Sequence, residues 1–224
     1  MRVAALISGG KDSVLALHEV INKYDVICLV CALPQNPHSY MFHTPNLHLL
    51  DAISSCLDLP ILKIPTKGVK EEEVKDLEEG LKLLNIDGIV IGGIESKYQK
   101  DRFERICENL GIKLISPLWK RDPYEIAKKI VNEFEVIFVK VSAMGLDENW
   151  LGRKFDSSAL NELKELYKKY KIHIAGEGGE FETLVLDAPL YKRRIKIIEA
   201  TKHWFKDWGV YEIKRFELVE KSAK

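Results

Sequence analysis

The chain has 224 residues, of which 46% are hydrophobic and 30% charged, a balance that can bury a core. Its 34 basic residues match its 34 acidic residues, so no net positive charge favours nucleic acid as a direct partner. No apolar run approaches the roughly 20 residues of a membrane span, and an apolar strand follows Met1 too closely for a signal peptide. We therefore expect a cytoplasmic protein without a membrane partner.

The first half of the chain alternates apolar runs with helical patterns. The apolar runs predict strands at residues 3–7, 26–31, 61–64, 88–91 and 113–115. Apolar residues spaced near 3.6 predict helices at residues 14–21, 46–56, 71–84 and 100–109. Because continuously apolar strands alternate with helices, we expect an α/β fold: a Rossmann-like parallel sheet with helices on both faces.

The pattern changes near residues 119–121, where we place the boundary between residues 1–119 and residues 120–224. Pro123 after Asp122 predicts one helix start, and Asp156 caps a charged helix that runs to Tyr170. Strands are predicted at residues 136–141, 183–186, 195–198 and 210–216. This second part is expected to be a smaller α+β domain.

Cys28 and Cys31 have the C-x-x-C spacing of redox pairs and half zinc sites. They lie inside a predicted buried strand, where positions three apart point to opposite faces. No second cysteine or histidine pair completes a metal site. We interpret the cysteines as small core residues.

A glycine-rich loop, Ser8-Gly9-Gly10-Lys11-Asp12-Ser13, separates the first strand from the first helix. Parallel sheets bind ligands at the carboxyl ends of their strands, so the loop has the right position for a binding site. Two glycines let the main chain approach a ligand closely, and the helix start presents amide donors to an anion. Lys11 adds an ammonium group, and the two serines add hydroxyl donors.

The loop does not have the G-x-x-x-x-G-K-[ST] spacing of the common P-loop. It resembles the S-G-G-x-D-S signature of the PP-loop ATP pyrophosphatases, which cleave ATP between the α and β phosphates. The resemblance implies a HUP-type sheet in residues 1–119, with ATP bound at Ser8, Gly9, Gly10, Lys11, Asp12 and Ser13. Lys11 would offset the charge of the departing pyrophosphate. Asp12 would ligate Mg²⁺, or would be an ordinary acidic residue in the first helical turn.

Other stretches narrow the resemblance. Gly92-Gly93 follows the fourth predicted strand, and Tyr98-Gln99-x-x-Arg102-x-Glu104 opens the next helix. Leu151-Gly152-Arg153 follows in the second part, before the distinctive run from His173 to Pro189, which contains Glu-Gly-Gly-Glu-Phe-Glu-Thr. With residues 39–44, these stretches resemble the diphthine–ammonia ligase family over nearly the whole chain.

The resemblance implies an ATP-dependent amidation. Diphthine, a modified histidine of translation elongation factor 2, would react with ammonium through an acyl-adenylate to give diphthamide, AMP and pyrophosphate. The expected partners are therefore elongation factor 2, ammonium and ATP, with ATP and Mg²⁺ as cofactors. Both a monomer and a homodimer are compatible with the sequence.

The acidic run suits a cationic substrate. If the chain is extended after Gly178 and Gly179, Glu180 and Glu182 share one face, with Phe181 and Thr183 on the other. One of the two glutamates is expected to bind and deprotonate ammonium. A solvated acidic hairpin is the alternative. Because trimethylammonium groups favour aromatic faces, the expected substrate-binding residues include Phe181 and Trp150. The others are Glu104, Gly152, Arg153, Glu177, Gly178, Gly179 and Thr183.

The remaining candidates are assigned to ATP. They are His43, Gly92, Gly93, Tyr98, Gln99 and Arg102. For Arg102 and Glu104 the alternative is an exposed helix surface, and for His43 an ordinary loop histidine.

Two other functions compete. A tRNA-modifying PP-loop enzyme would usually show catalytic cysteines in loops and a basic or zinc-bearing appendage. A non-enzymatic nucleotide sensor would leave Lys11 and Asp12 unexplained.

Overall fold

The computed structural model describes residues 1–35, 46–69 and 71–221. The chain divides into two compact units. The first contains Met1–Ser8, Asp12–Ser55 and Leu59–Trp119, and the second contains Gly9–Lys11, Cys56–Asp58 and Lys120–Lys224.

A five-stranded parallel sheet forms the centre of the first unit, with the strand order β3-β2-β1-β4-β5. The strands are β1 (Arg2–Leu6), β2 (Asp25–Pro34), β3 (Ile61–Thr66), β4 (Gly88–Val90) and β5 (Lys113–Ile115). The helices are α1 (Lys11–Val20), α2 (Leu50–Leu57), α3 (Glu72–Leu81) and α4 (Lys97–Leu110), with a short 3₁₀ helix η1 (Leu47–Leu49) before α2. The predicted Rossmann-like α/β fold is confirmed.

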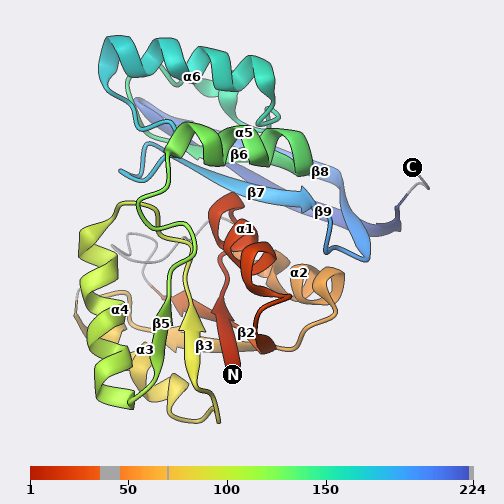
Figure 1. The fold of residues 1–224 in the computed structure, drawn as a ribbon. Helices are drawn as coiled ribbons and strands as arrows, with labels where there is room; N and C mark the ends of the chain where they lie inside the picture. The colour runs from red at the N-terminus through yellow and green to blue at the C-terminus, as the bar shows by residue number, and fades with distance from the viewer. Residues whose placement is uncertain (36–45, 70, 222–224) are drawn as a thin grey trace. The chain divides into compact units, whose positions relative to one another are not determined.

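Two helices cover one face of this sheet. Apolar residues of α3 and α4, among them Leu77 and Ile106, pack against strand residues such as Val30 and Ile89. Figure 1 shows these helices on one side of the sheet and α1 and α2 on the other. The burial of both faces explains why the strands read as continuous apolar runs.

The second unit is built on a four-stranded antiparallel sheet of order β7-β6-β9-β8. Its strands are β6 (Glu135–Val141), β7 (Phe181–Asp187), β8 (Arg193–Phe205) and β9 (Trp208–Glu220). Helices α5 (Pro123–Glu133) and α6 (Ser157–Tyr170) lie beside each other, with η2 (Glu148–Trp150) between β6 and α6 (Figure 1). This is the α+β architecture expected for residues 120–224.

Helix starts follow the capping residues of the sequence. The Asp122 side chain accepts hydrogen bonds from the amides of Tyr124 and Glu125, and Asp156 accepts one from the amide of Ala159. Both predicted starts are confirmed. Helix α4 begins three residues before the predicted position, because Ser96 caps it.

The ribbon of β8 and β9 is longer than predicted. The strands pair from Arg193 opposite Glu220 to Phe205 opposite Trp208, whereas the sequence indicated only residues 195–198 and 210–216. Many residues of both strands are exposed or half-buried, so the apolar pattern marked only part of each strand.

A cluster of aromatic residues fills the core of the second unit. The Phe138 ring centroid lies 5.0 Å from that of Trp150, 5.5 Å from that of Phe155 and 5.1 Å from that of Phe181. These edge-to-face and tilted contacts place the start of β7 and the residues after η2 against β6.

All four cysteines are buried and free. Burial raises the pKa of Cys31 to about 12 and the pKa values of Cys56 and Cys107 to about 11. Among the described residues, no group of three His, Cys, Asp or Glu side chains could hold a metal ion. Every helix in the described ranges falls short of the length and apolarity needed for a membrane crossing.

Candidate functional site

The glycine-rich loop follows β1, and its two serines are linked. The Ser8 amide donates to the Ser13 Oγ at 3.2 Å, and the two hydroxyl oxygens are also 3.2 Å apart. Helix α1 starts at Lys11, so the first-turn amides and the positive end of the helix dipole lie in this loop. The arrangement suits an anion such as phosphate.

Gly92 brings the segment after β4 against the first turn of α1. A Cβ at residue 92 would lie 2.7 Å from the Ser13 nitrogen and 2.8 Å from the carbonyl carbon and oxygen of Asp12. A residue with a side chain does not fit there. At Gly93 the nearest atom to a Cβ is the Gln99 Oε1 at 4.0 Å, so this second glycine has more room.

Lys11 belongs to the second unit, where its side chain is almost fully buried at 2% exposure. Its ammonium group donates to the Ala175 carbonyl oxygen at 2.6 Å. It also lies 5.4 Å from the Phe181 ring centroid and 5.9 Å from that of Phe155. The lysine therefore has a carbonyl and two aromatic rings around its charge, a favourable environment for a desolvated cation.

Main-chain bonds hold the same segment beside β7. The Val185 amide donates to the Gly9 carbonyl oxygen at 2.9 Å, and the Lys11 amide donates to the Thr183 Oγ1 at 3.2 Å. Sequence reasoning missed these contacts, because Lys11 and Thr183 are 172 positions apart and no local pattern links them. Thr183, an expected substrate contact, accepts this hydrogen bond from the loop main chain and is 7% exposed.

The run from His173 to Glu180 folds into a hydrogen-bonded turn. The His173 Nδ1 accepts hydrogen bonds from the amides of Ala175 at 3.1 Å and Glu177 at 3.4 Å. The His173 amide in turn donates to the Glu180 Oε1 at 3.0 Å. The two ends of the turn are thereby joined through a histidine that the sequence did not single out.

Ser142 and two glycines complete the turn. The Ser142 hydroxyl donates to the Gly179 carbonyl oxygen at 2.7 Å, and the Ser142 amide donates to the Glu180 carbonyl oxygen at 2.9 Å. Gly179 has a φ of 82°, in the left-handed region that favours glycine. At Gly178, a Cβ would lie 2.8 Å from the Glu180 Oε1, so the glycine leaves space for this carboxylate.

The next acidic residue has a different environment. Glu182 lies opposite Lys140 on the neighbouring strand, and the Lys140 ammonium donates to the Glu182 Oε1 at 3.0 Å. Both side chains are half-buried, with exposures of 25% for Lys140 and 13% for Glu182.

Trp150 and Arg153 form a stacked pair in the second unit. The Arg153 guanidinium carbon lies 4.4 Å from the Trp150 ring centroid, and the guanidinium donates to both Glu162 oxygens at 2.6 and 2.8 Å. This pairing raises the pKa of Arg153 and lowers that of Glu162. Trp150, an expected face for a trimethylammonium group, thus has an arginine over its ring and is 5% exposed.

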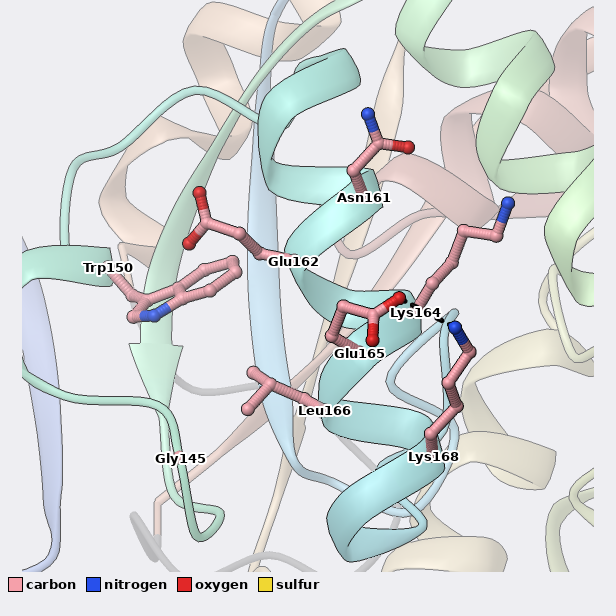
Figure 2. Close-up of a pocket in the computed structure, with 8 residues that line it drawn as sticks. All are labelled: Gly145, Trp150, Asn161, Glu162, Lys164, Glu165, Leu166 and Lys168. Carbon is pink, nitrogen blue, oxygen red and sulfur yellow. Dashed lines mark hydrogen bonds and ion pairs between the residues drawn. The ribbon is translucent and has the colours of Figure 1, made fainter.

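A groove of about 520 Å³ lies beside this pair. Figure 2 shows Trp150 facing α6 across it, with Glu162, Glu165 and Lys164 projecting from the helix. Glu165 is paired with Lys168 at 2.7 Å. Gly152, also an expected substrate contact, has a φ of 76°, and a Cβ there would lie 2.8 Å from the Tyr211 ring.

In the first unit, the Arg102 side chain contacts Glu71 and Tyr98. Its Nε donates to the Glu71 Oε1 at 3.0 Å, and its Nη1 donates to the Tyr98 carbonyl oxygen at 3.0 Å. Its guanidinium carbon lies 3.4 Å from the Tyr98 ring centroid. The hydrogen bond from Arg102 holds the pKa of Glu71 below its usual range. Glu104 pairs with Lys100 on the same helix and is 43% exposed.

His43 lies outside the described residues, as does the rest of the segment 39–44 that contributed to the resemblance.

Comparisons with known proteins cover both halves of the chain. The family model described as diphthamide synthase N-terminal domain matches residues 1–114, and the model described as diphthamide synthase C-terminal domain matches residues 122–219. A diphthine–ammonia ligase of Mus musculus is 34% identical, over 100% of this chain and 94% of its own length. The human diphthine–ammonia ligase is also 34% identical, over 90% of this chain and 84% of its own. That of Saccharomyces cerevisiae is 31% identical over 90% of this chain, which spans 35% of the yeast protein.

Proposed function

The chain belongs to the diphthamide synthase family, and from this premise we propose that it is a diphthine–ammonia ligase, an enzyme that uses ATP to amidate diphthine. One observation carries this proposal: the two family models together cover residues 1–114 and 122–219, so the match includes both units. The phosphate-binding geometry of the loop after β1 supports the use of ATP.

The reaction proceeds in two steps in this proposal. The diphthine carboxylate first attacks the α-phosphorus of ATP, which forms an acyl-adenylate and releases pyrophosphate. Ammonia then attacks the acyl carbon, and AMP leaves. Elongation factor 2 is the protein that carries the diphthine.

We assign the phosphates of ATP to the loop. The amides of Gly9 and Gly10 and the hydroxyls of Ser8 and Ser13 supply hydrogen-bond donors, and Lys11 supplies a positive charge for the departing pyrophosphate. Gly92 lies close to the main chain of the first turn of α1. Gly93, Tyr98, Gln99 and Arg102, in the segment that follows β4, and His43 complete the assigned ATP-binding set.

The loop offers one carboxylate, that of Asp12, to a magnesium ion. Mg²⁺ prefers oxygen ligands and commonly takes one or two carboxylates together with substrate phosphates. Asp12 is the carboxylate residue of the loop that also carries Ser8 and Ser13, so we propose that it would hold the ion. Bound Mg²⁺ would neutralise charge on the phosphates.

We assign diphthine and ammonium to residues 120–224, the part of the second unit that follows Trp119. Its acidic turn provides the carboxylates of Glu177 and Glu180, and β7 adds that of Glu182. Gly178 and Gly179 shape this turn, and Phe181 and Thr183 follow it on β7. Trp150, Gly152 and Arg153, which we also assign to substrate binding, lie in the second unit. Glu104 lies on α4, in the first unit.

The direct test incubates the protein with ATP, ammonium and diphthine-bearing elongation factor 2. Mass spectrometry of the factor should show the small mass decrease of a hydroxyl replaced by an amino group, and the nucleotide products should be AMP and pyrophosphate. ADP and phosphate would indicate a kinase or ATPase, and no turnover would indicate a nucleotide sensor. Either result would contradict the proposed ligase.

A tRNA-modifying enzyme is the other candidate from the same superfamily. Thiolation chemistry needs an accessible cysteine thiolate, whereas all four cysteines here are buried with raised pKa values. Tight RNA binding that weakens steeply with salt would favour this candidate over the ligase.

A further inference from the structure

The two glutamates that follow Gly179 both have a buried Oε2, and they differ in the group that binds Oε1: a lysine ammonium for Glu182 and a main-chain amide for Glu180. Glu182 accepts a hydrogen bond from the ammonium group of Lys140, its cross-strand neighbour. A carboxylate with its own lysine is a poor receptor for a second small cation, because the positive charge is already supplied.

One carboxylate oxygen of Glu180 accepts a hydrogen bond, and the other is buried. Its Oε1 accepts from the His173 amide at 3.0 Å. Its Oε2 is buried and has no hydrogen-bond partner among the described residues. A buried acceptor without a donor is costly, on the order of 1–3 kcal/mol, so this oxygen is suited to a donor that arrives with a ligand.

The surrounding turn fixes this carboxylate in place. Gly178 leaves the space that a Cβ would fill at 2.8 Å from Oε1 and 3.0 Å from Oε2. Ser142 binds the carbonyl oxygens of Gly179 and Glu180. The Nδ1 of His173 accepts from two amides of the turn, so the amide that holds Oε1 belongs to an ordered segment.

We propose that Glu180, and not Glu182, binds the substrate ammonium through Oε2 and takes its first proton. The inference rests on the proposed ligase function and names the ligand of one residue within it. Ammonium brings four N–H donors and a positive charge, which a buried carboxylate oxygen accepts with a charge-assisted hydrogen bond.

The proposed step balances. Ammonium gives one proton to the Glu180 carboxylate, and the lone pair of the resulting ammonia forms a C–N bond to the acyl carbon of the adenylate. The bond from this carbon to the AMP oxygen breaks, and its electron pair leaves with AMP. The nitrogen loses its second proton to water. The products are the amide, AMP and two protons.

The test compares Glu180→Gln with the matched variant Glu182→Gln, using two nucleophiles. Ammonium is protonated at neutral pH and needs a base, whereas hydroxylamine is largely unprotonated and attacks the same adenylate without one. For each variant, kcat/KM is measured with ammonium and with hydroxylamine on diphthine-bearing elongation factor 2. ATP–pyrophosphate exchange reports the adenylation step separately.

For Glu180→Gln we expect kcat/KM for ammonium to fall by about 10²-fold, the lower end of what a general base contributes. The hydroxylamine reaction and the exchange rate should stay near the wild-type values. Raising the pH should restore part of the ammonium reaction, because free ammonia becomes available. Glu182→Gln should leave the ratio of the two nucleophiles unchanged.

Equal losses with both nucleophiles in Glu180→Gln would overturn the proposal, as would a selective loss in Glu182→Gln. If Glu180→Gln does not fold, Gly178→Ala gives the same decision, because its Cβ displaces the carboxylate while both glutamates remain. A selective ammonium defect there supports the proposal, and an unchanged nucleophile ratio contradicts it. Absence of exchange and of any product in the wild type would instead refute the ligase function itself.

Discussion

The main chain of Gly92 lies directly against the main chain of Ser13: a Cβ at residue 92 would be 2.7 Å from the Ser13 nitrogen. The contact follows from the sheet, because β1 and β4 are paired neighbours and the chain leaves both at the same edge. The main chain at Gly92 therefore contacts the first turn of α1.

Gly92→Ala should therefore displace the loop. The added methyl group would meet backbone atoms, which cannot rotate away as a side chain can, so the Asp12–Ser13 peptide must shift. We expect weaker ATP binding and a fall of about 10²-fold in ATP–pyrophosphate exchange, as for a misplaced catalytic group. Calorimetric titration with a non-hydrolysable ATP analogue measures the first effect. Gly93→Ala, whose nearest atom to the added Cβ is 4.0 Å away, should show a smaller defect than Gly92→Ala, and an equal defect would count against the explanation.

Lys11→Ala removes the positive charge that we assign to the leaving pyrophosphate. Losing one such electrostatic contact typically lowers kcat by about 10²–10³-fold, and we expect a loss of this size in ATP–pyrophosphate exchange. The variant also leaves the Ala175 carbonyl without its ammonium donor, so its melting temperature must be measured alongside. Lys23→Ala, at an exposed position beyond α1, controls for a general charge effect. A folded Lys11→Ala protein with wild-type exchange would refute the role.

Glu71 should make stability depend on pH. Hydrogen bonds from Arg102 and Arg105 lower the pKa of Glu71 in the folded state. The ionised carboxylate therefore stabilises the folded protein fully at pH values above the pKa that Glu71 has in the unfolded chain. That contribution is lost as the pH falls through the folded-state pKa. At neutral pH we expect the wild type to have a higher melting temperature than Glu71→Gln. This difference in melting temperature should become smaller as the pH is lowered. Thermal melts of both proteins across the acidic range test this, and added salt should also reduce the gap.

Gly152→Ala should destabilise the second unit. Residue 152 has a φ of 76°, and a Cβ would lie 2.8 Å from the Tyr211 ring, so strain and overlap combine. A loss of about 1–3 kcal/mol is expected in chemical denaturation. Gly179→Ala is the matched case, because φ is 82° but no atom lies within 4 Å of a Cβ. It should cost less, and a larger loss at residue 179 would show that overlap with Tyr211 is unimportant.

The cysteines should resist modification in the folded protein. The thiolate is the reactive form, and burial raises the pKa of Cys31 to about 12. A thiol reagent at mildly alkaline pH should label the native protein very slowly and all four cysteines after denaturation. Rapid labelling of one native cysteine would reopen the case for thiol chemistry.

The sequence predicted the elements of the fold well because its local signals were strong. Asp122 and Asp156 marked helix starts, and the apolar runs marked every strand of the parallel sheet. The predicted strands were too short where many strand residues are exposed, as in the ribbon of β8 and β9.

The site was predictable as a set of segments but not as a set of contacts. The order of strands in the sheet explains why Gly92 approaches Ser13, yet no local pattern contains that order. The same holds for Lys140 beside Glu182 and for Glu71 beside Arg102, which are cross-strand and interhelical pairs. Identifying which carboxylate already has a cation needed the register of β6 and β7.

The path of the chain has a consequence for how this protein can be divided. Because Gly9–Lys11 and Cys56–Asp58 belong to the same unit as Lys120–Lys224, a single cut after Trp119 does not separate two whole pieces. A truncation to residues 120–224 would therefore lack six residues of that unit, among them Lys11, whose ammonium group binds the Ala175 carbonyl oxygen.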